Sequence, residues 1–473
     1  MAVELFQSAT FRWWLAGGHA LEAHFDRSWR RHEDTDIGIT RSDVPHLRDV
    51  LDGWDIVLAA DGALTPWDGR PLDDRSSRVG NLWCRPSPDA AWALDILIGD
   101  GNDHEWIYRR DPTIRRPWHE AVLATVDGVP YLAPEVQLLF KNKSGRPKDE
   151  IDAATVIPEL TPERRTWLAR HLPAEHAWQT VIAAHRARLA IEVATKRSAT
   201  VDLLASGRSS QAWRTVDSTQ QGVIRVPIPN SGRLIKYRSE VLIGELLADA
   251  AHPVSRWNVV RVDDVECAIG TILGGSPVAY DSDWSPSFTA AFASVLRDLH
   301  RLPVTGWGPL ANTSDELRGT SESANEGIID RWFHAPIWPF DRADLAAHTV
   351  AALDPDLVPV ITARRDAIAA AAAEPFGIVH SDLHNQHLLH VGGDLTGVLD
   401  FGDAFIGSTA WDFALLDWYY GAGNAQRVAQ AYGADSELTE RGTLLAIAVG
   451  CYKVAKAPHD PAALHRLRSL LAT

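Results

Sequence analysis

The stretch Ile378–Leu389, IVHSDLHNQHLL, and the run Gly397–Asp403, GVLDFGD, decide the fold of the C-terminal part of this 473-residue chain. Each is an apolar, strand-like segment that leads into a loop with acidic or imidazole side chains. A hydroxyl that receives a phosphoryl group needs a carboxylate to orient it, and a nucleoside triphosphate needs Mg²⁺ ligands near its phosphates. We expect Asp382 to fill the first role, and Asp400 and His387 to fill the second.

The two loops together resemble the aminoglycoside phosphotransferase family, which shares the two-lobed, protein-kinase-like fold. The family reads H-G-D-L-H-P-x-N and then I-D-F-G-D. The residues that match here are His380, Asp382, Leu383, His384, Asp400, Phe401, Gly402 and Asp403. The resemblance implies that Asp382 is the catalytic base or hydroxyl-orienting group and that Asp400 is the principal Mg²⁺ ligand.

His387 departs from that pattern, because most members carry Asn there. An imidazole nitrogen is a softer and less usual Mg²⁺ ligand than an amide oxygen. The same His resembles the 2″-phosphotransferases and the macrolide phosphotransferases, several of which prefer GTP. ATP and GTP therefore both stay open as donors.

A kinase-type site also needs a basic strand residue at the phosphates and a Glu on the next helix to hold it. Glu240 lies in a helical run, SEVLIGELLADA, for which we expect Ser239 to be the N-cap. Two basic residues precede it, Arg225 in the strand GVIRVP and Lys236 in the strand-like run RLIKYR. The short spacing from Lys236 to Glu240, and the likeness of SGRSSQAWRTV to a subfamily whose next strand reads v-x-R-f-P, favour Arg225. Lys236 stays the alternative.

The N-terminal part carries three acidic residues on strand-like segments next to a pair of glycines. One strand ends at Gly17 and Gly18, the next begins with Asp34 and Asp36, and a third projects Asp95 away from its apolar face. Three converging carboxylates repel one another unless cations lie between them. Two Mg²⁺ ions about 3.5–4 Å apart would satisfy them and clamp an in-line displacement at phosphorus. The glycines would let the backbone approach a triphosphate.

This region resembles the DNA-polymerase-β-like nucleotidyltransferases, in the antibiotic-modifying branch that includes aminoglycoside and lincosamide adenylyltransferases. Members read w-x-h-a-G-G-W-A-h-D and then R-x-H-x-D-h-D-h. The residues that match here are Trp14, Gly17, Gly18, Ala20, Arg31, His32, Asp34 and Asp36. The resemblance implies that Asp34 and Asp36 bind metal ions and that Asp95 completes the metal site or acts as a base.

Two further features belong to the same resemblance. The run LLFKNKSGRPKDEID is similar to that branch's L-x-K-x(4)-R-x-K-D-x-x-D segment, which implies triphosphate contacts from Lys141, Arg146 and Lys148. A solvated helix face explains these three residues equally well. His19 stands where the branch usually has Trp, and Glu22 stands where it has Asp; both changes concern the substrate more than the metals.

The layout predicts an α+β chain of two domains. Residues 1–190 would form a polymerase-β-like nucleotidyltransferase α/β domain with a helical appendix. Residues 198–473 would form the two-lobed phosphotransferase, with a β-rich lobe at about 198–275 and a helical lobe at about 276–473. Within the helical lobe we expect helices near 288–301, 342–352, 361–373, 410–421, 424–432 and 439–455.

Composition limits the partners. The chain has 46 Lys and Arg against 62 Asp and Glu, a formal charge of −16, which disfavours nucleic acid and suits a cationic small molecule. No apolar run approaches the roughly 18 residues of a membrane span, and the first residues lack a basic-then-apolar signal, so we expect a cytoplasmic protein. The three cysteines lie too far apart in sequence to indicate a disulfide framework or a structural zinc site.

The favoured hypothesis is a bifunctional antibiotic-modifying enzyme. Its N-terminal half would transfer a nucleoside monophosphate, and its C-terminal half the γ-phosphate of ATP or GTP, to hydroxyls of a small polar antibiotic such as an aminoglycoside, both with Mg²⁺. In a second hypothesis only one half is catalytic and the other binds or regulates. In a third, a nucleotidyltransferase acts on protein or tRNA under the control of the kinase half.

Overall fold

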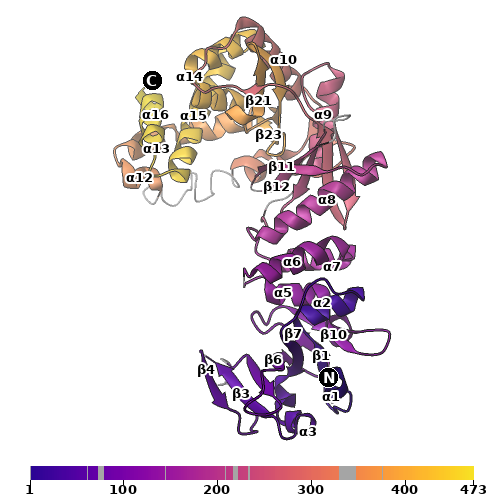
Figure 1. Cartoon of the computed structure of the whole chain (residues 1–473). Coiled ribbons are helices and arrows are strands. Elements are labelled where there is room, and N and C mark those ends of the chain that lie inside the picture. Colours follow the sequence, from indigo (N-terminus) through magenta and orange to yellow (C-terminus); the bar gives the residue numbers. More distant parts are fainter. Residues whose placement is uncertain are drawn as a thin grey trace. The chain divides into compact units, whose positions relative to one another are not determined.

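The computed structural model describes residues 2–60, 62–72, 79–143, 145–207, 209–216, 222–232, 235–329, 348–374 and 376–472. The chain forms two compact units (Figure 1). Unit 1 comprises Met1–Arg186, Ile228–Ser231 and Val262–Asp264. Unit 2 comprises Ala187–Pro227, Gly232–Arg261 and Val265–Thr473.

A mixed sheet forms the body of unit 1. Within the described residues its strands follow the order β4-β3-β5-β6-β2-β1-β10-β9, and β7 and β8 extend it from β6. Neighbours run antiparallel except for two parallel pairs, β2 with β6 and β1 with β10. The strands are β1 (Trp13–Leu15), β2 (Thr35–Thr40), β3 (Asp55–Ala60), β4 (Ala63–Pro66), β5 (Asn81–Arg85), β6 (Leu94–Gly101), β7 (Glu105–Ile107), β8 (Arg115–Pro117), β9 (Val122–Ala124) and β10 (Pro130–Leu132).

The helices of unit 1 begin where the sequence marks them. Proline opens α5, α6 and α7, as predicted, because the first residue of a helix has no intrahelical N–H bond to lose. The helices are α1 (Ala2–Phe6), α2 (Gly17–Phe25), the 3-10 helix η1 (Arg41–His46), α3 (Leu47–Val50), α4 (Trp118–Ala121), α5 (Pro134–Lys141), α6 (Pro147–Val156), the 3-10 helix η3 (Ile157–Glu159), α7 (Pro162–His171) and α8 (Ala177–Thr195), which continues into unit 2.

Unit 2 starts with a β-rich lobe. Its sheet has the order β11-β12-β13-β15-β14, and α9 (Tyr237–Asp249) joins the third strand to the fourth in sequence. The strand expected at GVIRVP is confirmed as β13, and VDLLAS and SQAWRT form the two strands before it. The strands are β11 (Val201–Ser206), β12 (Ser210–Thr215), β13 (Gly222–Pro227), β14 (Trp257–Val262) and β15 (Val265–Thr271).

Two expectations about the start of α9 were wrong. The run RLIKYR is described from Ile235 onward, and there it forms no strand: Lys236 is the N-cap of α9, and Tyr237 is its first residue. Ser239 therefore lies inside the helix, where its hydroxyl donates to the carbonyl oxygen of Lys236 (3.0 Å). The helix begins earlier than predicted because Tyr237 is buried there, with its ring 5.3 Å from the Arg225 guanidinium.

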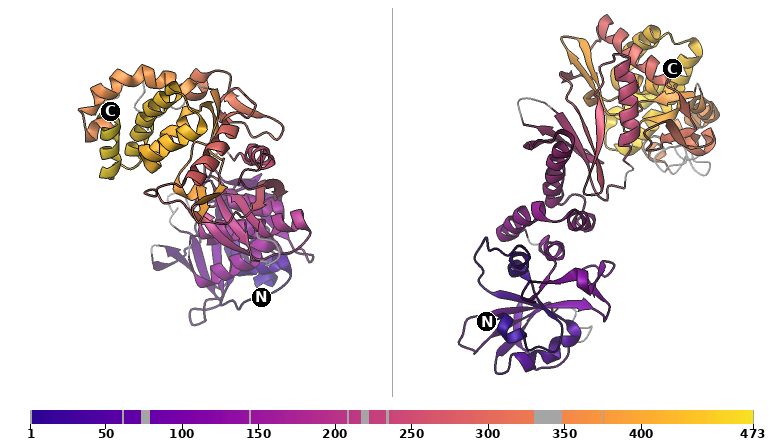
Figure 2. Two further views of the ribbon diagram at one scale, coloured as in Figure 1. Left: turned by 90° about the horizontal axis from the view of Figure 1, so that it is seen from above. Right: turned by 90° about the vertical axis from the view of Figure 1, so that its right-hand side faces the viewer.

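The rest of unit 2 is mostly helical, with short strands among the helices (Figure 2). The helices are α10 (Pro286–His300), the π-helix η4 (Asn325–Ile329), α12 (Thr349–Leu353), α13 (Leu357–Ala373), the 3-10 helix η6 (Asn385–His387), α14 (Ala410–Tyr432), α15 (Ser436–Lys456) and α16 (Pro461–Ala472). A helix was expected near 342–352, and the part of it up to residue 347 lies outside the described residues. The two helices expected at 410–421 and 424–432 are confirmed as the two parts of α14, which are separated by a kink with non-helical backbone at Gly421. The sequence analysis missed α16.

Two small sheets complete this lobe, and both contribute to the signature loops. One has the order β16-β21-β22 and the other β17-β19-β18-β23-β20. Their strands are β16 (Ser276–Pro277), β17 (Val304–Thr305), β18 (Trp307–Leu310), β19 (Leu317–Ser321), β20 (Phe376–Val379), β21 (Leu388–Val391), β22 (Asp394–Val398) and β23 (Phe405–Ser408).

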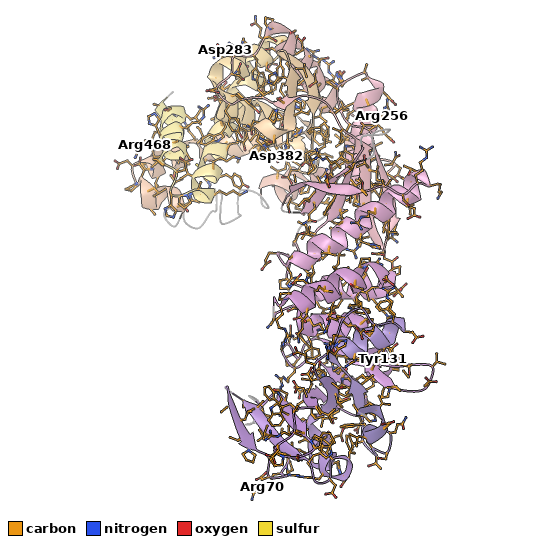
Figure 3. The ribbon with its side chains drawn as sticks, in the orientation of Figure 1. Arg70, Tyr131, Arg256, Asp283, Asp382 and Arg468 are labelled. Carbon is orange, nitrogen blue, oxygen red and sulfur yellow. The ribbon has the colours of Figure 1, made fainter. Side chains whose placement is uncertain are left out.

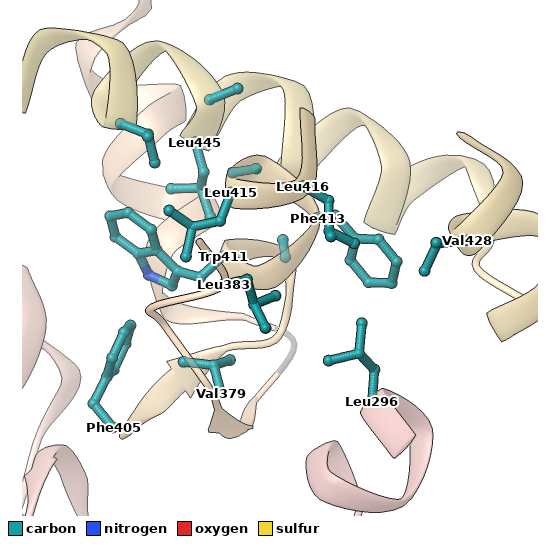
Figure 4. Packing of buried hydrophobic residues seen from close by; sticks show 14 of the residues in the cluster. Leu296, Val379, Leu383, Phe405, Trp411, Phe413, Leu415, Leu416, Val428 and Leu445 are labelled. Atoms are coloured by element: carbon teal, nitrogen blue, oxygen red, sulfur yellow. The ribbon is translucent and has the colours of Figure 1, made fainter. Parts of the chain in front are cut away.

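Each unit has its own hydrophobic core. In unit 2, Leu383 of the HSDLH loop is fully buried, and it points into the cluster formed by Val379, Trp411 and their neighbours (Figure 4). Burial of Leu383 fixes the backbone on which Asp382 stands. None of the helices in the described part of the chain is both long enough and apolar enough to cross a membrane.

Candidate active sites

The acidic pair of unit 1 is built by two parallel strands in register. Asp36 of β2 lies directly beside Asp95 of β6, on the face opposite the buried Ile37 and Ile96. Asp34 lies just before β2 and is exposed. The sheet therefore brings two of the three predicted carboxylates together, with the third two residues away along the same strand direction.

The electrostatics of this pair favour a cation. Burial, followed by the nearby negative charges of Asp36 and Asp34, raises the pKa of Asp95 to about 7, although Asn81 opposes this by donating to both carboxylate oxygens (2.9 and 3.1 Å). Burial and Asp34 also raise the pKa of Asp36. A carboxyl group that resists ionisation next to like charges is relieved by a bound divalent ion. The donor set, all carboxylate oxygen, fits Mg²⁺.

Gly17 and Gly18 open α2 directly against this pair. A Cβ at Gly17, whose φ is +64°, would lie 1.7 Å from Oδ2 of Asp36. A Cβ at Gly18 would lie 2.2 Å from the Arg30 guanidinium. Both positions exclude a side chain, so the helix N-terminus can approach Asp36 closely. The Gly17 N–H donates to Oε1 of Gln137 (2.8 Å), which fixes this approach.

The three basic residues predicted to contact a triphosphate lie around the same carboxylate, since Lys141, Lys148 and Arg146 all oppose the rise in the pKa of Asp36. Lys141 is buried, and its Nζ contacts Asp149 (2.7 Å) and Asp152 (3.0 Å). Arg146 donates from Nε to Asp149 (2.8 Å), and Lys148 is exposed.

Several residues that shape this site escaped the sequence analysis. Asn81 and Gln137 hold Asp95 and Gly17, and nothing local in the sequence marks them. The buried acids Asp149 and Asp152 anchor Lys141 and, through Asp152, Arg30 as well. Their signal was present, because they are the D-x-x-D end of the LLFKNKSGRPKDEID run, but only its basic residues were assigned roles.

The HSDLH loop of unit 2 is held by a buried carboxylate. Asp412, at the start of α14, accepts hydrogen bonds from the backbone N–H groups of His380 and Ser381 (both 2.9 Å). His380 is fully buried and reaches the carbonyl oxygen of Leu399 through Nε2 (2.9 Å). Ser381 has φ +65°, a strained conformation that these contacts enforce. Asp382, labelled in Figure 3, is thus presented by a rigid loop.

His387 lies between the two predicted acidic residues. Its Nδ1 is 2.7 Å from the carbonyl oxygen of Asp382, a distance that places the ring proton on Nδ1. In the neutral ring Nε2 is then an acceptor, and it lies 3.5 Å from Oδ2 of Asp400. Two acceptors that face each other are stabilised by a cation between them. These residues therefore fit a divalent metal ion.

Arg225 and Glu240 form the expected basic–acidic pair of the β-rich lobe. Arg225 lies 2.5 Å from Glu240 and 3.3 Å from Asp400, and its guanidinium stacks near Tyr237 and Trp257. Burial alone would lower the pKa of Arg225, but the two carboxylates hold it above its usual value. Arg225 forms an ion pair with Glu240, and the nearby positive charge of Lys236 also opposes the rise in the pKa of Glu240.

Lys236, the alternative, lies at the N-cap of α9 and donates to the carbonyl oxygen of Ala404 (3.5 Å). Asp400 lies two residues beyond β22 with φ +62°. Burial would raise the pKa of Asp400, but Arg225 and His387 hold it at about 2. Asp400 is therefore an anion over the whole physiological range, as a metal ligand must be.

A row of aromatic rings begins at His384, whose ring lies against that of His387 with centroids 3.8 Å apart. The imidazole of His384, whose Nε2 is 3.7 Å from the Asp382 carboxylate, has its ring centroid 6.5 Å from that of Tyr419. Tyr419 stacks on Tyr280 with centroids 5.6 Å apart. Lys453 lies over the Tyr419 ring at 4.5 Å. This row can receive a flat or ring-shaped molecule that brings a hydroxyl to Asp382.

Two family models match the chain. The model described as "Phosphotransferase enzyme family" matches residues 200–445, just over half of the chain. The model described as "Aminoglycoside-2''-adenylyltransferase" matches residues 1–64, which include Gly17, Gly18, Asp34 and Asp36. Both families are transferases, as the sequence analysis predicted. No curated protein sequence matches the chain.

Solved structures similar to this chain include aminoglycoside phosphotransferases. A thermostable mutant of APH(4)-Ia in ternary complex with AMP-PNP and hygromycin B is 16% identical, covers 60% of this chain and 97% of its own, and has a TM-score of 0.45. The GDP and kanamycin complex of APH(2")-IIia is 16% identical, with coverages of 60% and 96% and a TM-score of 0.43. A putative fructosamine-3-kinase from Haemophilus somnus is 14% identical, with coverages of 60% and 95% and a TM-score of 0.39.

Proposed function

The chain belongs to the phosphotransferase enzyme family, and from this premise we propose that it is a bifunctional enzyme that modifies hydroxyl groups of a small polar antibiotic. Unit 2 transfers the γ-phosphoryl group of ATP or GTP. Unit 1 transfers a nucleoside monophosphate, AMP in the first instance, and releases pyrophosphate. An aminoglycoside is the first substrate to test, since the adenylyltransferase model matches unit 1 and the chain carries a formal charge of −16.

In unit 2 the observation that carries the proposal is the facing pair of acceptors, Nε2 of His387 and the Asp400 carboxylate, 3.5 Å apart. These two groups would hold Mg²⁺, which neutralises charge on the phosphates. Asp382 orients the acceptor hydroxyl, and Arg225 contacts the phosphates while Glu240 holds it in place. The ring of the acceptor lies against Tyr419 and Tyr280.

In unit 1 the support comes from the register pair Asp36 and Asp95, whose pKa values are both raised, by burial first and then by neighbouring carboxylates. With Asp34 they would hold the metal ions, and Asp95 either completes that site or serves as the base. The backbone at Gly17 and Gly18 receives the triphosphate. Arg146 and Lys148 contact it directly, together with the more deeply buried Lys141.

Mass spectrometry tests both activities at once. The full chain is incubated with a panel of aminoglycosides, macrolides and tuberactinomycins, first with ATP and then with GTP. We expect a gain of one phosphate from unit 2 and of one nucleoside monophosphate from unit 1. D382A should remove only the first gain, and D36A only the second.

The two alternative functions predict other outcomes of these assays. If D36A or D382A leaves every modification of the panel unchanged, the corresponding unit binds ligand without turnover. If labelled nucleotide enters added protein or total RNA but none of the antibiotics, unit 1 acts on a macromolecule.

A further inference from the structure

Unit 1 contains a cluster of three metal-ligating side chains apart from the carboxylate pair Asp36 and Asp95. His19 and Glu22 are three residues apart on α2, and His32 comes from the segment that leads into β2. One ligand atom from each of the three lies within 4.8 Å of the others. We propose that His19, Glu22 and His32 form a binding site for a transition-metal ion of the Zn²⁺ type, distinct from the Mg²⁺ positions at the aspartates.

The geometry of Glu22 and His32 suits a shared ion. Oε1 of Glu22 accepts from the backbone N–H groups of Trp29 (3.1 Å) and Arg30 (3.4 Å), which leaves Oε2 directed at His32. Nε2 of His32 is buried and lies 3.0 Å from Oε2 of Glu22. Two ligands at tetrahedral positions on one zinc, each about 2.0–2.1 Å from it, lie about 3.3 Å apart.

His19 supplies the third ligand from one turn earlier on the same face of the helix. Its ring centroid is 4.0 Å from that of His32. The backbone of Asp34 also forms a hydrogen bond with the ring. A ring nitrogen of His19 lies within 4.8 Å of the ligand atoms of Glu22 and His32, and we expect the ring to turn toward an ion held by these two residues.

The charges around the cluster are compatible with a cation. Arg30, a basic side chain that faces the cluster, is bound by both oxygens of Asp152 (2.8 and 3.1 Å), which Lys141 also contacts (3.0 Å). The Asp152 carboxylate therefore offsets part of the positive charge of Arg30.

The ligand types select the metal. Two imidazoles and one carboxylate are a common set for Zn²⁺, whereas Mg²⁺ prefers oxygen ligands throughout. The all-oxygen set at Asp34, Asp36 and Asp95 is the type that Mg²⁺ prefers. The proposed ion would join the first turns of α2, which begin with the two glycines, to the chain that enters β2. Its binding would therefore stabilise unit 1 whether or not unit 1 is catalytic.

The test must distinguish zinc bound at this cluster from zinc bound at a similar cluster in unit 2. In unit 2, Asp382, His384 and His387 also offer ligand atoms within 4.8 Å of one another. The background protein is therefore the full chain with H384A and H387A. It is dialysed against buffered Zn²⁺, and bound zinc is measured by mass spectrometry of the metal. We expect about one equivalent.

On this background, H19F and E22Q are added singly, and H104A serves as a matched control because His104 is an exposed residue of the same unit. We expect H19F and E22Q to weaken Zn²⁺ binding at least tenfold and H104A to leave it unchanged. D36A should also leave it unchanged, which distinguishes the new site from the Mg²⁺ positions. Circular dichroism in EDTA shows whether each variant is folded.

Two further measurements report on the same site without relying on activity. Zn²⁺ should raise the unfolding temperature of the background protein and not that of H19F, since an ion that binds only the folded state stabilises it. Co²⁺ bound at the site should absorb in the visible range as a four-coordinate ion. The proposal is overturned if the background protein binds no zinc, or if folded H19F and E22Q bind it as tightly as the background protein.

Discussion

Arg225 is the residue that we propose contacts the phosphates of the nucleotide in unit 2. Its guanidinium contacts Glu240 of α9 and Asp400 of the GVLDFGD loop at the same time. A planar fork with several donors can do this, whereas a lysine ammonium, a point charge, can satisfy only one partner well. Removing the cation would also leave two carboxylates close together and partly buried.

We therefore predict that R225A lowers kcat/KM for phosphate transfer by about 10–100-fold, that R225K recovers part of this loss, and that K236A changes it by less than about threefold. Steady-state kinetics with ATP and with GTP measure these ratios. A larger loss in K236A than in R225A would identify Lys236 as the phosphate contact instead.

Asp95 makes the stability of unit 1 depend on pH, and the direction of this dependence follows from its raised pKa. Its pKa is about 7 in the folded protein and about 3.9 in an unfolded chain, so the folded state binds more protons between these values. Stability without metal must then fall as the pH rises from about 4 to about 7. We predict that in EDTA at pH 8 D95N unfolds at a higher denaturant concentration than wild type, by at least about 1 kcal/mol.

The difference should vanish below about pH 4, where Asp95 is protonated in both states. Urea unfolding at several pH values, followed by tryptophan fluorescence, gives the comparison. Equal stability of D95N and wild type at pH 8 in EDTA would mean that Asp95 is not under the repulsion inferred here.

At the scale of elements, the N-terminus of α2 depends on the absence of a side chain. Gly17 combines φ +64° with a predicted Cβ position 1.7 Å from Asp36. We predict that G17A destabilises unit 1 by about 2–4 kcal/mol and abolishes nucleotidyl transfer, because both the backbone conformation and the carboxylate must move. Thermal unfolding and the mass assay measure the two effects.

Gly53 is the matched control for this substitution. It has a similar φ of +74°, and a Cβ there would meet nothing within 4 Å. G53A should therefore cost only about 1 kcal/mol, the backbone part alone, and should leave nucleotidyl transfer unchanged. If G53A and G17A have the same effects, the close approach of α2 to Asp36 contributes neither to stability nor to nucleotidyl transfer.

The sequence predicted the elements whose pattern is local. Alternation placed Asp36 and Asp95 on the face away from buried isoleucines, and proline marked three helix starts. It failed where a distant contact decides the outcome. RLIKYR alternates like a strand, yet α9 begins at Tyr237, whose ring is buried near Arg225 from the neighbouring strand.

The candidate sites follow the same rule. The acidic residues and glycines came from short patterns, and so did His387. The groups that hold these residues in place were not predicted, because the two partners are far apart in sequence. Gln137 is 120 positions from Gly17, and Asp152 is 122 positions from Arg30. A single sequence does not indicate which distant residues pair, even where a motif marks one partner, as the D-x-x-D pattern marks Asp152.

At the scale of the whole molecule, the models of two transferase families match different parts of the chain, which has two separate hydrophobic cores. A cluster that includes Ile96 fills unit 1, and a cluster that includes Leu416, labelled in Figure 4, fills unit 2. Cooperative unfolding follows the extent of a continuous core. Each unit should therefore melt as a block of its own.

We predict two transitions in calorimetry of the full chain. Ile96 and Leu416 are both fully buried, so I96A and L416A should each remove about 2–5 kcal/mol from one unit only. For units of this size that corresponds to a fall of roughly 5–15 °C in one transition while the other stays in place. Nucleotide with Mg²⁺ should raise the transition that L416A lowers, since the phosphotransferase family match covers unit 2. If both substitutions shift a single joint transition, the two cores unfold as one cooperative block, and loss of activity in one unit could then arise from damage to the other.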